Sequence, residues 1–76
     1  MTHFRQGSFY YRRKDNGRYL QVMYSADTKL ASISDVSEAV AVFTYMEVEQ
    51  NIEISAEEFA TALTNALTLL CENTKL

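Results

Sequence analysis

The apolar and polar positions of the first third of the chain alternate as they do in a β-hairpin. Two runs rich in aromatic and β-branched residues, 9–13 and 19–24, flank a polar segment that contains Asn16-Gly17. An Asn-Gly pair between two strand-like runs is a strong signal for a hairpin, because a type I′ turn requires positive φ at both of its central positions. The sequence therefore predicts two antiparallel strands joined at this turn.

Two registers of this hairpin are compatible with the turn. If Asn16-Gly17 is a two-residue turn, Tyr11 lies opposite Val22. One strand face then collects five apolar residues: Phe9, Tyr11, Leu20, Val22 and Tyr24. If residues 15–17 form a three-residue loop with a glycine bulge, Arg12 lies opposite Leu20, in the middle of the apolar face. A slip of one residue moves every side chain of a strand to the other face, so the misplaced arginine favours the two-residue turn.

The middle of the chain predicts further strands. Residues 29–34 follow a turn-like cluster and are expected to form a third strand. Residues 35–48 are ambiguous, since their apolar positions fit helical spacing in the first half and alternation in the second. The density of β-branched and aromatic residues favours a fourth strand over 40–48, entered through one helical turn at 35–38. Whether 35–42 begin as helix or strand stays open.

The last third predicts an amphipathic helix over about 56–71. Ser55 is the expected N-cap, Glu58 completes a capping box, and Ile54 and Phe59 occupy the two positions of a hydrophobic staple. The helix is expected to bury one apolar stripe: Phe59, Ala62, Leu63, Ala66, Leu67 and Leu70.

Together these elements predict a single α+β domain over residues 1–76. The expected order is β-β-β-β-α, a small antiparallel meander of three to four strands with one C-terminal helix packed on one face. Because one helix covers only one face, the other face is expected to expose aromatic and basic side chains, which are typical of protein interfaces. The predicted contact residues are Tyr10, Arg12, Tyr19, Met23 and Tyr45.

Composition restricts the class of protein. No proline and 47% apolar residues favour a folded domain over a disordered segment. The single cysteine excludes an intramolecular disulfide and is consistent with a reducing compartment. The sequence shows no signal-peptide pattern and no apolar run long enough to span a membrane. These features predict a cytoplasmic protein that does not bind membranes.

The charges are distributed unevenly along the chain. Residues 1–30 hold six basic and two acidic residues, a net charge of +4, whereas residues 31–76 hold one basic and eight acidic residues, a net charge of −7. The acidic half offers a second candidate surface, because small acidic inhibitors can occupy basic or nucleic-acid-binding sites of larger proteins. Its residues are Glu47, Glu49, Glu53 and Glu57.

Residues able to support catalysis are scarce. Cys71 and His3 lie near opposite ends of the chain; we expect the thiol to be buried and inert and the histidine to be a frayed surface residue. No spacing typical of a metal site and no phosphate-binding glycine loop is present. We therefore expect no catalytic residues, no metal and no cofactor.

These observations predict a non-enzymatic protein–protein interaction module, such as a small inhibitor or adaptor. The first alternative is single-stranded nucleic-acid binding through the aromatic and basic hairpin face, where bases would stack on tyrosines and cations would pair with phosphates. Cations near a hairpin tip more often keep strands soluble, so this alternative ranks lower. The second alternative is a structural homodimer.

Overall fold

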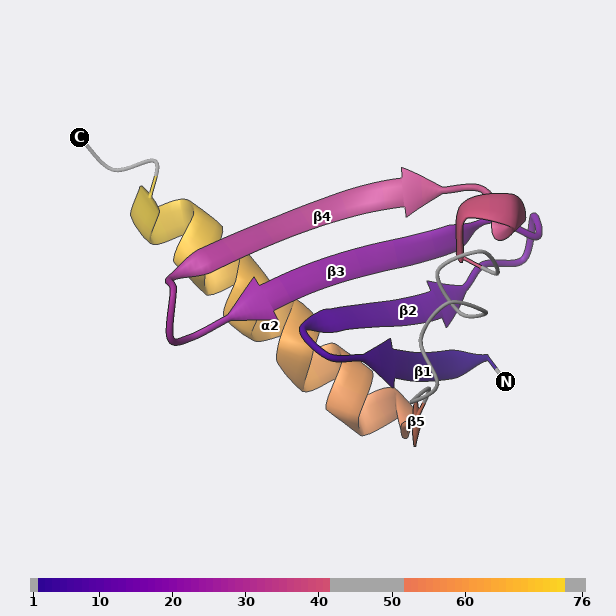
Figure 1. Ribbon diagram of the computed structural model, residues 1–76, viewed down its shortest axis with the longest axis horizontal. Coiled ribbons are helices and arrows are strands. Elements are labelled where there is room, and N and C mark those ends of the chain that lie inside the picture. Colours follow the sequence, from indigo (N-terminus) through magenta and orange to yellow (C-terminus); the bar gives the residue numbers. More distant parts are fainter. Residues whose placement is uncertain (1, 42–51, 74–76) are drawn as a thin grey trace.

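The described part of the protein is a five-stranded antiparallel sheet with one long helix packed on it (Figure 1). The computed structural model describes residues 2–41 and 52–73. The sheet has the order β4-β3-β2-β1-β5, and the predicted α+β fold is confirmed. Its elements are β1 (His3–Gln6), β2 (Phe9–Arg13), β3 (Tyr19–Ser25), β4 (Leu30–Val36), β5 (Ile52–Glu53) and the helix α2 (Ala56–Asn73).

Three regions of secondary structure differ from the prediction: β1, β5 and the segment from Val36 to Ala41. β1 was not expected; it pairs with β2 across a two-residue turn in which Gly7 has a φ of 58°. β4 runs through Val36, and the helical turn lies at 38–41 instead of 35–38. Ser37 begins this turn by accepting a hydrogen bond on Oγ from the Val40 amide at 3.2 Å. Val40 is therefore helical, and residues 42–48 of the expected fourth strand lie outside the described residues.

The hairpin adopts the register that the sequence analysis rejected. Tyr11 lies opposite Gln21, and Arg12 lies opposite Leu20. The Lys14 amide donates to the Arg18 carbonyl at 2.7 Å, so residues 15–17 form a three-residue loop. Gly17 has a φ of 83°, as the last residue of such a loop requires.

Arg12, whose position on the apolar face argued against this register, lies in a favourable environment. Arg12 lies on the same face as Leu20 and remains exposed. Its guanidinium carbon is 5.6 Å from the centre of the Phe59 ring, within the range of a cation–π interaction. The expected cost of burying a charge therefore does not arise.

The helix confirms the local signals of the sequence. Ser55 Oγ accepts a hydrogen bond from the Glu58 amide at 3.1 Å, as an N-cap does. Ile54 and Phe59 are both buried in the same cluster, as the hydrophobic staple requires. One residue of the predicted stripe is wrong: Leu67 is 53% exposed, because it lies on the flank of the buried face.

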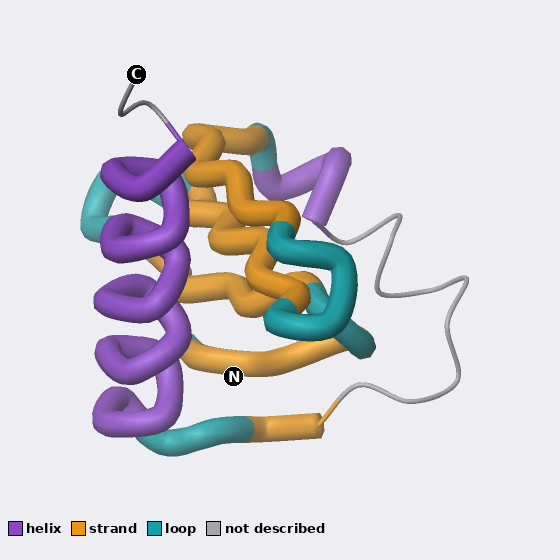
Figure 2. The backbone as a smooth tube through the Cα atoms, turned by 90° about the vertical axis from the view of Figure 1, so that its left-hand side faces the viewer, coloured by secondary structure: helices purple, strands orange, loops and turns teal. Residues whose placement is uncertain are grey.

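The sheet carries a buried cluster on each face. Figure 2 shows α2 on one side of the sheet and the helical turn at 38–41 on the other. We call the side under α2 the helix face and the other side the opposite face. The helix-face residues of the sheet that pack with α2 are Tyr10, Leu20, Val22, Tyr24, Ala31 and Ile33.

The opposite face is not the open aromatic surface that was expected. Phe4 and Tyr11 stack there with ring centres 4.8 Å apart. Tyr11 is fully buried, and Tyr19 and Ala41 complete the cluster. Gln21 Nε2 donates a hydrogen bond to the Tyr11 hydroxyl at 2.8 Å, which satisfies that buried polar group. The register shift supplies this second core, since it turns Tyr11 away from the helix.

Candidate functional site

The structure does not bring the predicted contact residues together. Tyr10 and Arg12 belong to the helix face, whereas Tyr19 and Met23 belong to the opposite face. Tyr19 is only 7% exposed, and Tyr10 and Met23 are half-buried. Tyr45 lies outside the described residues. The four described residues therefore do not form one continuous surface.

The alternative acidic surface is only partly described. Glu53 is exposed on β5, and Glu57 is exposed in the first turn of α2. Glu47 and Glu49 lie outside the described residues. Glu57 is nevertheless part of another feature, a pocket beside the helix.

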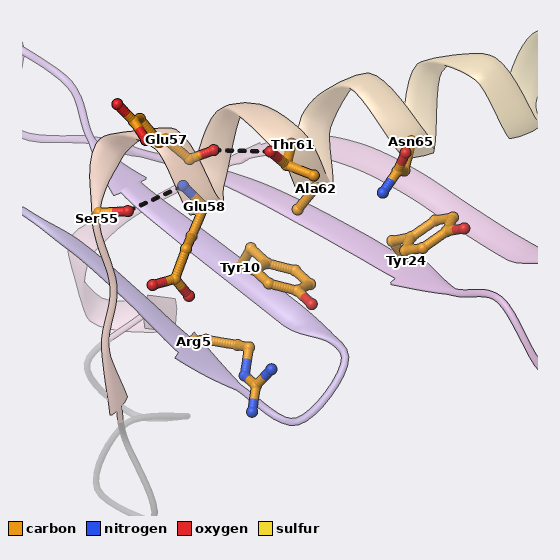
Figure 3. A pocket seen from close by; sticks show the side chains of 9 residues that line it. All are labelled: Arg5, Tyr10, Tyr24, Ser55, Glu57, Glu58, Thr61, Ala62 and Asn65. Atoms are coloured by element: carbon orange, nitrogen blue, oxygen red, sulfur yellow. Dashed lines mark hydrogen bonds between the residues drawn. The ribbon is translucent and has the colours of Figure 1, made fainter.

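A hollow lies between α2 and the helix face of the sheet (Figure 3). Its volume is about 550 Å³. Two of the residues around it, Tyr10 and Glu57, were named from the sequence as candidate contacts. The pocket is lined by Arg5, Tyr10, Tyr24, Ser55, Glu57, Glu58, Thr61, Ala62 and Asn65.

Strand register and helical periodicity build this pocket. Arg5 on β1 lies opposite Tyr10 on β2, which in turn lies opposite Val22 on β3. Tyr24 follows Val22 by two residues and shares its face. On α2, residues 58, 61, 62 and 65 are three or four apart, so they line one flank of the helix. The pocket is therefore formed by residues far apart in the sequence.

Arg5 is the chemically distinctive residue of the pocket. Its guanidinium carbon lies 6.0 Å from the centre of the Tyr10 ring. Its Nε atom is buried, and no atom of the described structure accepts a hydrogen bond from it. A buried donor without an acceptor costs about 1–3 kcal/mol, so such groups are rare in native proteins.

Two acidic residues of the first turn of α2, Glu57 and Glu58, line the pocket, where acidic residues complement the positive end of the helix dipole. In Figure 3 the side chain of Glu58 extends from α2 toward the sheet, on the side where Arg5 lies, whereas that of Glu57 points away from Arg5. Within the described residues Arg5 forms no salt bridge with either carboxylate. The pocket thus presents one cation and one facing carboxylate, with a second carboxylate at its border, to external partners.

The basic hairpin tip forms a second and smaller hollow. Arg12, Arg13, Lys14 and Asp15 line about 410 Å³. Lys14 Nζ lies 3.0 Å from an Asp35 carboxylate oxygen, and Arg18 Nε lies 2.9 Å from the other. The hydrogen bond from Lys14 and then that from Arg18 lower the pKa of Asp35 below its usual value of 3.8. Two cations of the tip are therefore already paired with a carboxylate of β4.

The residues considered for catalysis lie apart and differ from expectation. Cys71 is exposed near the end of α2 and not buried, because it lies outside the apolar stripe. His3 is a half-buried residue of β1 and not a frayed one; its ring packs edge-on against Phe59 at 5.7 Å. Within residues 2–41 and 52–73, no three potential metal ligands cluster. The described helices include none that is both long and apolar enough to cross a membrane.

The sequence analysis missed the pocket because it missed β1. Arg5 is placed only by the pairing of β1 with β2, and Tyr10 only by the observed hairpin register, because the predicted register put Tyr10 on the other face. A signal was present: Gly7-Ser8 separates two short runs, and such a pair is typical of a two-residue hairpin turn. Reading it would have placed Arg5 beside Tyr10.

Comparison with known proteins adds no family to this geometry. No family model matches the chain, and neither a curated protein nor a solved structure matches it. The pocket and the strand edges are therefore interpreted from their own physical chemistry.

Proposed function

We propose that this chain is a non-enzymatic protein-binding module and that the pocket beside α2 receives a polar group of its partner. The observation that carries this proposal is the buried Arg5 Nε atom, which has no hydrogen-bond acceptor among the described residues. It lies in a side chain that lines the pocket. A partner that supplies an acceptor there removes a desolvation cost that the free protein bears. Binding is thereby favoured over the free state.

The chemistry of the expected group follows from the guanidinium. A carboxylate accepts from arginine through two parallel hydrogen bonds, which makes it the best-fitting acceptor. The group is therefore an acidic side chain or a C-terminal carboxylate of the partner. Tyr10 and Tyr24 flank the site, and tyrosine and arginine are the residue types that contribute most to protein interfaces. Glu57 and Glu58 disfavour a second acidic group beside the first and favour a basic neighbour.

The lining of the pocket favours a partner protein over a small molecule as its ligand. Small-molecule sites are predominantly apolar and enclose most of their ligand. Here eight of the nine lining residues carry a charged or hydrogen-bonding group, and Ala62 is the sole aliphatic one. A partner protein adds contact area around the pocket, whereas a small ligand would rely on the lining of the pocket alone. An inhibitor or an adaptor role then depends on which protein supplies the acidic group.

Nucleic-acid binding has less support from the described structure. Tyr10 and Tyr19 lie on opposite faces, and Tyr19 is buried, so the two cannot stack successive bases on one surface. Of the cations at the hairpin tip, Lys14 and Arg18 are held by Asp35. Arg12 and Arg13 alone make a small footprint for phosphates.

A displayed library of short peptides tests the proposal. We expect the wild-type protein to enrich peptides with an acidic residue or a free carboxylate beside a basic one. For these peptides, Arg5→Gln should raise the dissociation constant by about tenfold or more, because a charge-assisted hydrogen-bond pair contributes about 1.5–3 kcal/mol. Fluorescence anisotropy with labelled peptides measures the constants.

The matched control is Arg13→Gln, which removes a cation of β2 that does not line this pocket. It should leave peptide affinity within about twofold of the wild type, since surface charges away from the site have small effects. Circular dichroism verifies that both variants remain folded. Equal affinities for the wild type and Arg5→Gln would overturn the pocket as the binding site. A steep loss of nucleic-acid affinity with salt would instead favour the hairpin tip.

A further inference from the structure

β4 forms an outer edge of the sheet (Figure 1). It pairs along its whole length of seven residues with β3, and no described strand pairs with its other side. On that side, alternate residues direct backbone N–H and C=O groups away from β3. An edge of this kind is a template for another strand.

β4 lacks the features by which proteins usually protect such an edge. Its sequence, Leu30-Ala31-Ser32-Ile33-Ser34-Asp35-Val36, contains no proline and no lysine or arginine. Its pairing with β3 runs without a bulge. The one charged residue, Asp35, forms ion pairs with Lys14 and Arg18 of its own chain. The other edge of the described sheet, β5, is only two residues long.

We infer that β4 pairs antiparallel with β4 of a second copy of this chain, forming a two-fold symmetric dimer with one continuous sheet. The two-fold axis passes through Ile33, perpendicular to the sheet. This symmetry keeps both helices on the same side of the joined sheet and makes the interface isologous. Pairing over seven residues supplies about six to eight backbone hydrogen bonds.

The sequence of β4 is self-complementary, which favours a second copy of this chain as its partner. In this register Leu30, which is 55% exposed in the monomer, lies opposite the partner's Val36 and gains an apolar neighbour. The two-fold symmetry places this apolar pair at each end of the interface. Ser32 lies opposite the partner's Ser34, and Ile33 opposite its own copy. Ala31 lies opposite the partner's Asp35, so no two like charges meet. Every pair shares a sheet face, as antiparallel pairing requires.

Sedimentation velocity over a wide range of concentration tests the dimer directly. We expect a concentration-dependent shift from a species of 8.7 kDa to one of twice that mass. Hydrogen exchange at high and low concentration should show slower exchange of β4 amides in the larger species. A chain that stays monomeric at the highest concentration would overturn the inference.

Two double variants test the register. Ser32→Lys with Ser34→Lys places like charges directly opposite each other at two symmetry-related pairs, and it should raise the dissociation constant of the dimer by about tenfold or more. Ser32→Lys with Ser34→Glu places opposite charges at the same two pairs and should keep the dimer at least as tight as in the wild type. The variants differ at one residue, Ser34, which is exposed in the monomer. Equal weakening by both would overturn the pairing about Ile33, and a dimer unaffected by either would place the interface elsewhere.

This inference is independent of the proposed pocket. Arg5→Gln should leave the monomer–dimer equilibrium unchanged, because Arg5 lies on β1, which is separated from β4 by β3 and β2. The lysine double variant should in turn leave peptide binding at the pocket unchanged. Loss of either function alone therefore identifies which proposal fails.

Discussion

At the scale of single residues, Asp35 connects the end of β4 to the neighbouring β2–β3 loop, which is distant in sequence. It lies near the end of β4, and both of its carboxylate oxygens are held by cations from the β2–β3 loop, Lys14 and Arg18. Asn16 fixes the same loop, since its side-chain oxygen accepts a hydrogen bond from the Arg18 amide at 3.0 Å. The charge pattern of the hairpin tip therefore has a structural role within this chain.

The ion pairs of Asp35 with Lys14 and Arg18 predict that the stability of the fold depends on pH. Because Lys14 and Arg18 hold the folded-state pKa of Asp35 below its usual value of 3.8, the pair stabilises the fold above about pH 4. This contribution is lost as the pH falls through the lowered pKa. We expect Asp35→Asn to lower the melting temperature slightly at neutral pH, with a difference from the wild type that shrinks toward zero in strong acid.

The control for this prediction is Asp27→Asn. Asp27 lies in the exposed β3–β4 turn, at the other end of the strands from Lys14 and Arg18. The thermal melting of the three proteins is compared from neutral to strongly acidic pH. A wild-type advantage over Asp35→Asn that persists undiminished in strong acid would contradict the assigned role of the carboxylate.

At the scale of elements, local signals were predicted correctly and pairings were not. The helix follows from a cap at Ser55 and from the periodic apolar residues behind it, all within twenty residues of sequence. In the observed hairpin register Arg12 on β2 contacts Phe59 on α2. The sequence of the hairpin alone does not reveal a contact with an element so distant along the chain. β1 was not predicted for the same reason, because its four residues form a strand by pairing with β2 and β5.

The turn at Gly17 gives a test of the observed register. Gly17 has a φ of 83°, and a Cβ added there meets no atom within 4 Å. Replacement by alanine therefore costs only backbone strain, about 1–2 kcal/mol for a residue with a Cβ in the left-handed region. We expect Gly17→Ala to lower the free energy of unfolding by this amount, as measured by chemical denaturation.

Asparagine provides the comparison, because it tolerates positive φ better than alanine. Gly17→Asn should lose clearly less stability than Gly17→Ala. Two variants as stable as the wild type would indicate that the loop does not hold Gly17 in the left-handed region.

At the scale of the whole molecule, β2 and β3 separate two buried clusters that share one backbone. Val22 is fully buried under α2, whereas Tyr11 on the neighbouring strand is fully buried on the opposite face. Because β2 and β3 contribute residues to both clusters, loss of either strand from the sheet would disrupt both clusters. The described fold should therefore unfold as one cooperative unit, as small domains usually do.

Val22→Ala tests this coupling. Removing two methyl groups from a fully buried site should lower the free energy of unfolding by about 2 kcal/mol. The helical signal in the far ultraviolet and the tyrosine signal in the near ultraviolet should shift together. Val40→Ala is the matched control, since Val40 is 48% exposed and its truncation should change stability by about 0.5 kcal/mol or less. Separate transitions for the two signals would refute a single unit.

The position of α2 after the four strands of the meander has a consequence for how the protein is made. A chain leaves the ribosome N-terminal residues first, and apolar surface that is exposed before folding is complete is prone to aggregate. β1–β4 are synthesised before α2, yet Leu20, Val22 and Ile33 depend on α2 for their cover. A nascent chain that ends before Ala56 therefore lacks the element that buries these side chains. Their exposure, and the risk of aggregation that it brings, ends only when the last helix leaves the exit tunnel.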